Sequence, residues 1–195
     1  QRLPGLLQSV QFLADAAKRR SDPLRFLISG SSARKLKRGG ANLLPGRILE
    51  YRLLPLAARE LDYDISTKKA LSLGTLPEPY LGSSPEESAL LLKTYSATYL
   101  KEEIQAESLT RNISGFARFL TTITEQAGKF LDLSKAATKA KIPRQAAGRF
   151  LEILEDTLIA HRVEAYTGLE SWDLVKHPRL FFFDVGVLNG MFGNF

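Results

Sequence analysis

Two short apolar stripes, separated by only a few residues, constrain the fold of this chain more than any other feature. The stripes are Leu133, Ala137 and Ala140, followed by Ala147, Phe150, Leu151 and Leu154. Residues three, four and seven positions apart lie on one face of an α-helix, so each set predicts an amphipathic helix. The short connection requires a sharp turn, and the small alanines let the two helices pack closely.

Signals at the helix ends agree with this pattern. Ser134 is a candidate N-cap for the first helix, and Pro143 suits the start of the second, where its missing N–H costs nothing. No glycine lies at the tight turn, and Lys141 stands where one is usual. The β-prone segment 157–166 that follows is a candidate wing strand. The sequence therefore predicts a winged helix-turn-helix over about residues 113–185.

The composition is that of an ordinary globular protein, and it argues against several kinds of site. The 195 residues suffice for one large domain or two small ones. The absence of cysteine excludes disulfides and thiolate metal sites, and the two histidines, His161 and His177, argue against a histidine-rich metal site. No apolar run reaches the roughly 18 residues of a membrane span, and Arg2, Pro4 and Gly5 do not open a signal peptide. We therefore expect a cytoplasmic protein that does not contact membranes.

The formal net charge of +6 bears on the partners of the protein. A positive surplus favours nucleic acid or another acidic surface. A surplus of this size is also compatible with no polyanionic partner, so charge leaves both alternatives open.

The first third of the chain predicts a small α/β part. Leu3–Arg19 has helical spacing with basic residues in its last turn. The apolar run Leu24–Ser29 predicts a buried strand whose end is polar. The alternating segment Arg47–Leu53 predicts a second strand, and Pro55–Leu61 predicts a short helix.

Helices dominate the rest of the sequence. Ser66–Leu73 predicts a helix that ends at Gly74, and Leu76–Ser84 is a linker rich in Pro, Gly and Ser that marks the best domain boundary. Ser84 followed by Pro85 and Glu87 is a strong helix start with a capping box. The other predicted elements are helices from Ser84 towards Leu109, from Phe116 to Ile123 and from Val185 to Met191, and a buried strand over Arg179–Asp184.

Five blocks of the sequence resemble one protein family. The blocks are Phe26–Leu36, Leu43–Arg47, Tyr99–Glu107, Phe150–Leu158 and Lys176–Asp184. They are similar to the prokaryotic AAA-type ATPases with a C-terminal domain of unknown function, often described only as "ATP-binding protein". The blocks come in the family's order and cover nearly the whole chain.

The resemblance implies a mainly α fold with a small α/β part. Residues 1–79 would be the C-terminal remnant of an AAA-type ATPase core. Residues 80–195 would be a helical domain that contains the winged helix. Members of the family begin with a Walker A loop and a Walker B strand, which would lie before Gln1, and continue past this chain's end into a region resembling a PD-(D/E)XK nuclease. We therefore expect a middle fragment of a longer protein.

The sequence contains no loop of the kind that binds nucleotide phosphates. The phosphate-binding loop needs Gly-x-x-x-x-Gly-Lys-Ser/Thr, but Gly40 and Gly46 are one residue too far apart and Arg47 replaces Lys-Ser. Arg179–Asp184 imitates a Walker B strand, although the alternative is a core strand followed by a capping Asp184. We expect ATP and Mg²⁺ to bind the intact protein and this fragment to be inactive alone.

The resemblance also assigns candidate nucleotide-facing residues. Ser29, Gly30, Ser31 and Ser32 would form the polar tip of the sensor strand, with the hydroxyls of Ser29 and Ser31 near the γ-phosphate or the attacking water. The structural alternative is a strand-to-helix turn with a capping serine. Arg34 and Arg47 are candidates for a phosphate-facing arginine or an arginine finger, because a guanidinium stays charged and offers a planar fork. The alternative for each arginine is a solvated surface charge.

The candidate DNA contacts lie on the helix pair. They are Lys135, Lys139, Lys141, Arg144, Gln145 and Arg149. A recognition helix reads bases with its N-terminal residues, and lysines of the preceding helix contact phosphates. Against this, Glu152, Glu155 and Asp156 make the second half of the same helix acidic. Packing of the winged helix on its own ATPase core or on a partner is the alternative that stays open. Gly148 within a helix would permit close approach of a backbone or of DNA.

A different class of protein also fits the sequence. The chain could be a stand-alone winged-helix module that binds DNA or protein and has no enzymatic role. A third alternative is a surface for self-association between subunits.

Overall fold

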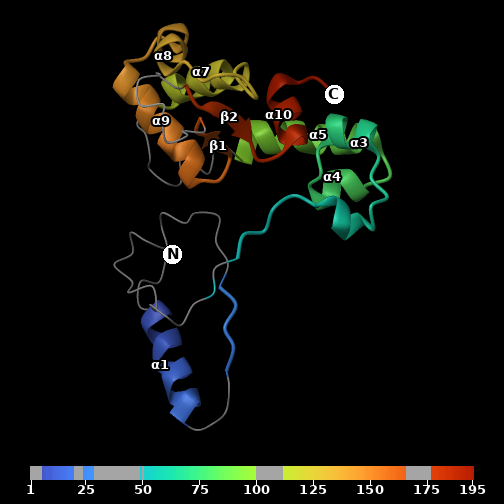
Figure 1. Ribbon diagram of the computed structural model, residues 1–195, viewed down its shortest axis with the longest axis vertical. Coiled ribbons are helices and arrows are strands. Elements are labelled where there is room, and N and C mark those ends of the chain that lie inside the picture. The colour runs from blue at the N-terminus through green and yellow to red at the C-terminus, as the bar shows by residue number, and fades with distance from the viewer. Residues whose placement is uncertain (1–5, 20–23, 29–48, 50, 100–111, 166–176) are drawn as a thin grey trace, which may run out of the picture. The chain divides into compact units, whose positions relative to one another are not determined.

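A computed structural model of the chain describes residues 6–19, 24–28, 49, 51–99, 112–165 and 177–195 (Figure 1). The chain divides into two compact units, Gln1–Arg52 with Asp156–Leu158 and Leu53–Glu155 with Ile159–Phe195. The described residues are mainly helical, with one two-stranded sheet. This confirms the predicted fold class at the level of a mainly α protein.

The first unit contains helix α1, Leu6–Arg19, which confirms the helix predicted from the apolar spacing. Lys18 and Arg19 lie in its last turn, where cations interact favourably with the helix dipole. The strand predicted over Leu24–Ser29 is wrong for its described part, because residues 24–28 lie in no strand and are exposed. The same holds for the described residues of the strand predicted over Arg47–Leu53. A strand needs a hydrogen-bonded neighbour, and no described segment pairs with either one.

Short helices open the second unit. They are η1 (a 3₁₀-helix, Ala58–Leu61), α3 (Thr67–Leu73), α4 (Pro77–Leu81), α5 (Pro85–Thr94) and η2 (a π-helix, Tyr95–Tyr99). Ser66 caps α3 by accepting a hydrogen bond from the Lys69 amide, and Gly74 ends the helix with φ +70°. Both ends of this helix therefore lie where the sequence predicts them.

Two sequence predictions in this region need correction. The segment Leu76–Ser84 is not an open linker, because it contains α4, and the Ser88 hydroxyl of α5 donates to the Pro79 carbonyl at 3.0 Å. The helix that starts at Ser84 is α-helical only to Thr94 and then widens into η2, and the rest of the predicted range lies outside the described residues. At its start, Ser84 accepts from the Glu87 amide at 3.2 Å, which confirms the cap.

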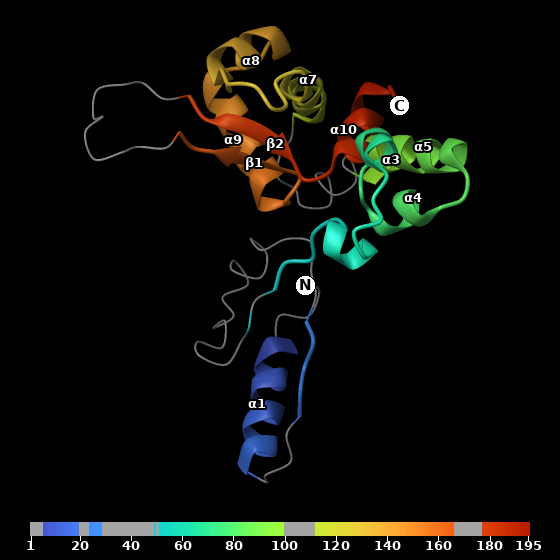
Figure 2. The same cartoon turned by 45° about the vertical axis from the view of Figure 1, so that its right-hand side comes forward.

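The last helix, α10 (Val185–Phe192), follows strand β2 (Arg179–Phe182) almost directly. The predicted helix and strand are confirmed, but the strand is buried only at Leu180 and Phe182. Asp184 caps α10 through the Val187 amide at 2.9 Å and also accepts from the Thr75 amide at 2.8 Å. This buried carboxylate therefore has a capping role, which was the structural alternative to a Walker B aspartate. A small core of Leu73, Leu92 and Val187 joins α3, α5 and α10, which lie side by side in Figure 2.

The largest hydrophobic core is formed by three helices and the sheet. The elements are α7 (Ile113–Thr124), α8 (Leu133–Ala140), α9 (Arg144–Asp156), β1 (Ala160–Val163) and β2. The strands are antiparallel, with Ala160 opposite Phe182 and Val163 opposite Arg179. Phe119, Ile123, Leu154 and Leu180 are fully buried in this core. None of the described helices is long and apolar enough to cross a membrane.

Candidate nucleic-acid interface

The turn between α8 and α9 is built on a left-handed residue that is not glycine. Lys141 has φ 54° and ψ 50°, its amide donates to the Thr138 carbonyl at 3.1 Å, and the Ile142 amide donates to the Ala137 carbonyl at 3.1 Å. These two bonds are those of a Schellman motif, and Ile142 and Ala137 are both buried beneath it. The predicted sharp turn is therefore present, with Lys141 in the position that usually holds glycine.

The start of α8 differs from the prediction. Asp132, not Ser134, is the N-cap: its carboxylate accepts from the Lys135 amide at 2.9 Å. Ser134 lies one position inside the helix, where its hydroxyl accepts a hydrogen bond from Nε of Arg144 at 3.0 Å. Both residue types are good caps, and the helix begins at Leu133 because Leu133 packs against the core. Ser134 instead connects the start of α9 to α8.

Helix α7 fixes the orientation of the helix pair. Nε of Arg118 donates to the carbonyl of Ala140 at 2.9 Å, which satisfies one of the last carbonyls of α8. The rings of Phe116 and Phe119 lie 5.1 and 5.8 Å from the ring of Phe150 on α9. Side chains on the exposed faces of α8 and α9 are therefore presented by a well-packed support.

The structure brings the six candidate DNA contacts onto α8, the turn and the first half of α9. All six residues, Lys135, Lys139, Lys141, Arg144, Gln145 and Arg149, are exposed. Lys139 forms an ion pair with Glu125, and Arg144 donates to Ser134. No ion pair joins Lys135, Lys141 or Arg149 to another described residue. Three cations are thus left to interact with solvent or with a partner.

The acidic half of α9 is less available than its sequence indicates. Glu155 accepts two hydrogen bonds from Arg162 of β1, both at 2.8 Å. This bidentate pair raises the pKa of Arg162 above its usual range and compensates the Glu155 charge within the fold. Glu152 is exposed on the same helix. The charge gradient along α9 is therefore weaker at its acidic end than the sequence alone predicts.

Gly148 lies in the middle of α9, where glycine costs roughly 1 kcal/mol relative to alanine. A Cβ placed on Gly148 would have no described atom within 4 Å. Packing within the described part of the chain therefore does not require glycine here. The position is adjacent to Arg149 on the partly exposed side of the helix.

The nucleotide-facing candidates cannot be placed in the same way. Ser29, Gly30, Ser31, Ser32, Arg34 and Arg47 all lie outside the described residues. Their assignment stays a prediction from the family resemblance.

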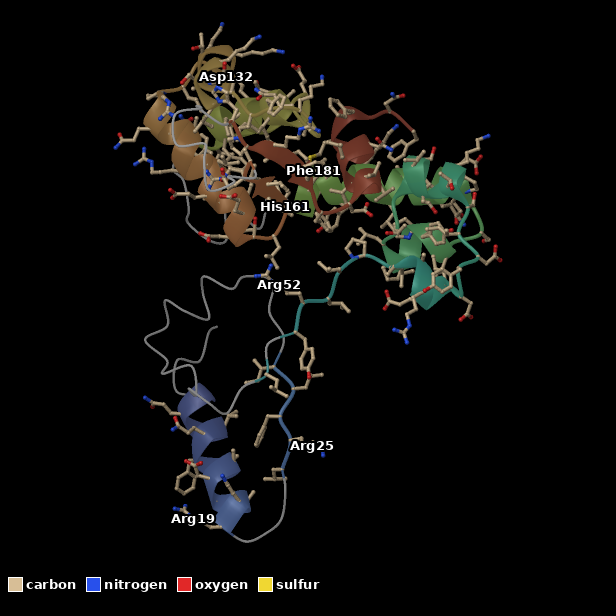
Figure 3. All side chains as sticks on the ribbon, in the orientation of Figure 1. Arg19, Arg25, Arg52, Asp132, His161 and Phe181 are labelled. Carbon is tan, nitrogen blue, oxygen red and sulfur yellow. The ribbon has the colours of Figure 1, made fainter. Side chains whose placement is uncertain are left out.

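Sequence reasoning missed one group of exposed side chains, on the outer face of the sheet. Arg179 and Phe181 alternate with buried residues along β2, and His161 lies opposite Phe181 (Figure 3). The sequence Arg-Leu-Phe-Phe of this strand does not alternate between polar and apolar residues, so it gave no signal that Phe181 is exposed. The partner strand and its register were not visible in the sequence.

Comparison with known proteins finds two family models that match different parts of the chain. Residues 1–62 match the family model described as AAA domain, and residues 65–195 match the model described as a domain of unknown function (DUF8612). No curated protein and no solved structure matches the chain significantly. The first match supports an ATPase-related segment ahead of the second domain. Since the second match covers more than half of the residues, this chain belongs to the DUF8612 family of domains of unknown function.

Proposed function

We propose that residues 113–185 form a winged helix that binds duplex DNA through α8 and the first half of α9. The order of α7, α8, α9 and an antiparallel strand pair supports this proposal. In such a module, the second helix of the pair enters the major groove with its N-terminal residues, and the preceding helix contacts the backbone. Arg144 and Gln145 would then face base edges, and Lys135 and Lys139 would face phosphates.

The observation that carries the proposal is the set of exposed cations around the α8–α9 turn. Lys135, Lys141 and Arg149 form no ion pair with a described residue, and the Arg144 guanidinium is oriented by Ser134. A cation near a phosphate releases condensed counterions, which favours binding and makes it depend on salt. Within the described part of the chain, the apolar core beneath these residues supports the two helices but offers no group that neutralises the cations.

We further propose that the intact protein couples this module to ATP. The match of residues 1–62 to the AAA domain supports nucleotide binding by that part of the protein. The AAA-type core would bind ATP and Mg²⁺, with Ser29 and Ser31 as sensor hydroxyls and Arg34 or Arg47 facing phosphate. The 195-residue chain lacks the phosphate-binding loop motif, so we expect it to show no Mg²⁺-dependent ATP hydrolysis. Robust hydrolysis by the purified chain would refute this assignment.

Duplex binding is tested by fluorescence anisotropy of a labelled DNA duplex over a salt series. If about four cations contact phosphates, log K falls with a slope of about −3.6 against log salt, and affinity drops roughly 100-fold between about 50 and 200 mM. Arg149→Ala should reduce the magnitude of the slope by about 0.9. Lys68→Ala, which removes an exposed cation from α3, is the matched control and should leave binding unchanged.

Two results would contradict the proposal. One is a salt-independent affinity, because phosphate contacts would then not drive binding. The other is equal loss for Arg149→Ala and Lys68→Ala. Concentration-dependent light scattering that changes with Arg149→Ala but not with DNA would instead assign the α8–α9 face to self-association.

A further inference from the structure

The outer face of the sheet carries a cluster of aromatic and cationic side chains. In an antiparallel sheet, residues directly opposite each other project from the same face. His161 lies opposite Phe181, and Val163 lies opposite Arg179. Phe130, on the segment that follows α7, forms an antiparallel bridge with Arg179. These five residues therefore share one face, which we call the aromatic face.

The rings of the aromatic face are exposed to solvent. Phe130 is 64% exposed and Phe181 is 36% exposed. The Arg179 guanidinium carbon lies 4.8 Å from the centroid of the Phe130 ring. The His161 and Phe181 rings stack at 5.9 Å with an interplanar angle of 23°. Phe130 is thus paired with the cation of Arg179, and Phe181 with the ring of His161.

A rigid support lies beneath this face. The Gly128 amide donates to the Leu180 carbonyl at 2.7 Å, and the Leu131 amide donates to the Pro178 carbonyl at 2.8 Å. Leu180 and Phe182 of the same strand point to the opposite side and are buried in the core. The exposed rings are therefore mounted on backbone that is hydrogen-bonded on both sides of β2.

The charge on this face is of one sign. Among the five residues of the aromatic face none is acidic, and Arg179 is an exposed cation; of the residues next to them in the sequence, Lys129 and Glu164 are both exposed. On the other face of the strand pair, the Glu155 carboxylate accepts a hydrogen bond from Arg162, which lies opposite buried Leu180. A ligand that combines negative charge with flat apolar surfaces complements this arrangement.

We propose that the aromatic face binds single-stranded DNA, with bases stacking on Phe130 and Phe181 and a phosphate near Arg179. Base–aromatic stacking is available to any unpaired base, because every base has a π-face. Bases inside a duplex are already stacked on each other, so a duplex cannot use these rings. The choice of DNA over RNA rests on the proposed function, because α9 suits the DNA major groove and not the narrow groove of an RNA helix.

The test is anisotropy of a labelled oligothymidine of about 20 nucleotides with the 195-residue chain. Phe130→Ala and Phe181→Ala should each weaken binding by about 5- to 150-fold, the range expected for loss of one stacked base. Phe130→Trp keeps an aromatic surface and should retain binding. Phe192→Ala removes a phenylalanine of similar exposure, 49%, from α10 and is the matched control that should not change affinity.

Separate arms distinguish this inference from duplex binding. Arg149→Ala should weaken duplex binding and spare the oligothymidine, whereas Phe130→Ala should do the reverse. If Phe130→Ala and Phe192→Ala behave alike, or if Phe130→Trp binds no better than Phe130→Ala, the stacking role is refuted. Equal loss of duplex and single-strand binding in Phe130→Ala also refutes it. Tighter binding of a matched oligouridine would overturn the assignment to DNA.

The two proposals can fail independently. Duplex binding without oligothymidine binding refutes only the aromatic face as a DNA site. Oligothymidine binding without duplex binding refutes the winged-helix proposal and leaves the aromatic face. Thermal melts of each variant, followed by circular dichroism, show whether a loss of affinity reflects unfolding, and Phe130→Trp keeps the test decisive if Phe181→Ala does not fold.

Discussion

Replacing Lys141 by glycine should stabilise the protein and weaken its binding to duplex DNA. Lys141 holds the left-handed conformation that ends α8, with φ 54° and ψ 50°. This conformation costs an L-residue about 1–2 kcal/mol, a cost that glycine does not carry. Glycine loses about 0.5–1 kcal/mol more chain entropy on folding, which offsets part of that gain. The net stabilisation of Lys141→Gly is then about 0.5–1 kcal/mol.

The same substitution removes one exposed cation from the α8–α9 turn. If Lys141 contacts a phosphate, the magnitude of the salt slope should fall by about 0.9 and affinity at about 0.1 M salt should fall roughly eightfold. Differential scanning calorimetry should show a rise in Tm of about 1–4 °C, as expected for a protein of this size. Anisotropy with duplex DNA should show the loss of affinity.

The prediction is that Lys141→Gly raises the Tm and lowers the affinity for duplex DNA. A lower Tm for Lys141→Gly would mean that the lysine side chain stabilises the turn by contacts that its geometry does not indicate. An unchanged affinity would remove Lys141 from the DNA interface. Lys141→Arg keeps both the charge and the backbone cost, so it should match the wild type in both measurements.

Three further predictions concern stability. Asp184→Ala removes the α10 cap and leaves the Thr75 amide without its acceptor, so unfolding by denaturant should show a loss of about 2–4 kcal/mol. Gly186→Ala would place a Cβ 2.1 Å from a backbone carbonyl oxygen and should lower the free energy of unfolding by about 3 kcal/mol. Gly148→Ala meets open space and should raise it by about 0.5–1 kcal/mol. A change of the same sign for both variants would contradict this reasoning. The hydrogen bonds to Glu155 raise the pKa of Arg162, so their contribution is complete below the unfolded-state pKa and is lost only at very high pH; Arg162→Ala should therefore cost the same, at most about 1 kcal/mol, at about pH 6 and pH 9 by chemical denaturation.

The helix pair could be predicted from sequence because its determinants are local. Apolar spacing within eight to thirteen residues fixed α8 and α9. The cap of α8 could not be chosen in advance, since Asp132 and Ser134 have similar capping ability and packing of Leu133 decided between them. The left-handed conformation of Lys141 could not be predicted either, because glycine is the residue that usually ends a helix in this way.

Elements that depend on distant partners were predicted less well. Strands over Leu24–Ser29 and Arg47–Leu53 were expected from local apolar patterns, but a strand exists only where another strand pairs with it. The aromatic face depends on a register between β1 and β2, and on a bridge from Phe130 to Arg179. Neither pairing follows from the spacing of residues along one segment.

The Asp184 carboxylate connects strand β2, helix α10 and the segment after α3 within the second unit. A single residue, Phe183, separates it from β2, and its two oxygens hold the first turn of α10 and the segment after α3. A displacement of the strands therefore reaches α3 without a slack loop to absorb it. Strain applied at one end of this unit is expected to register at the other.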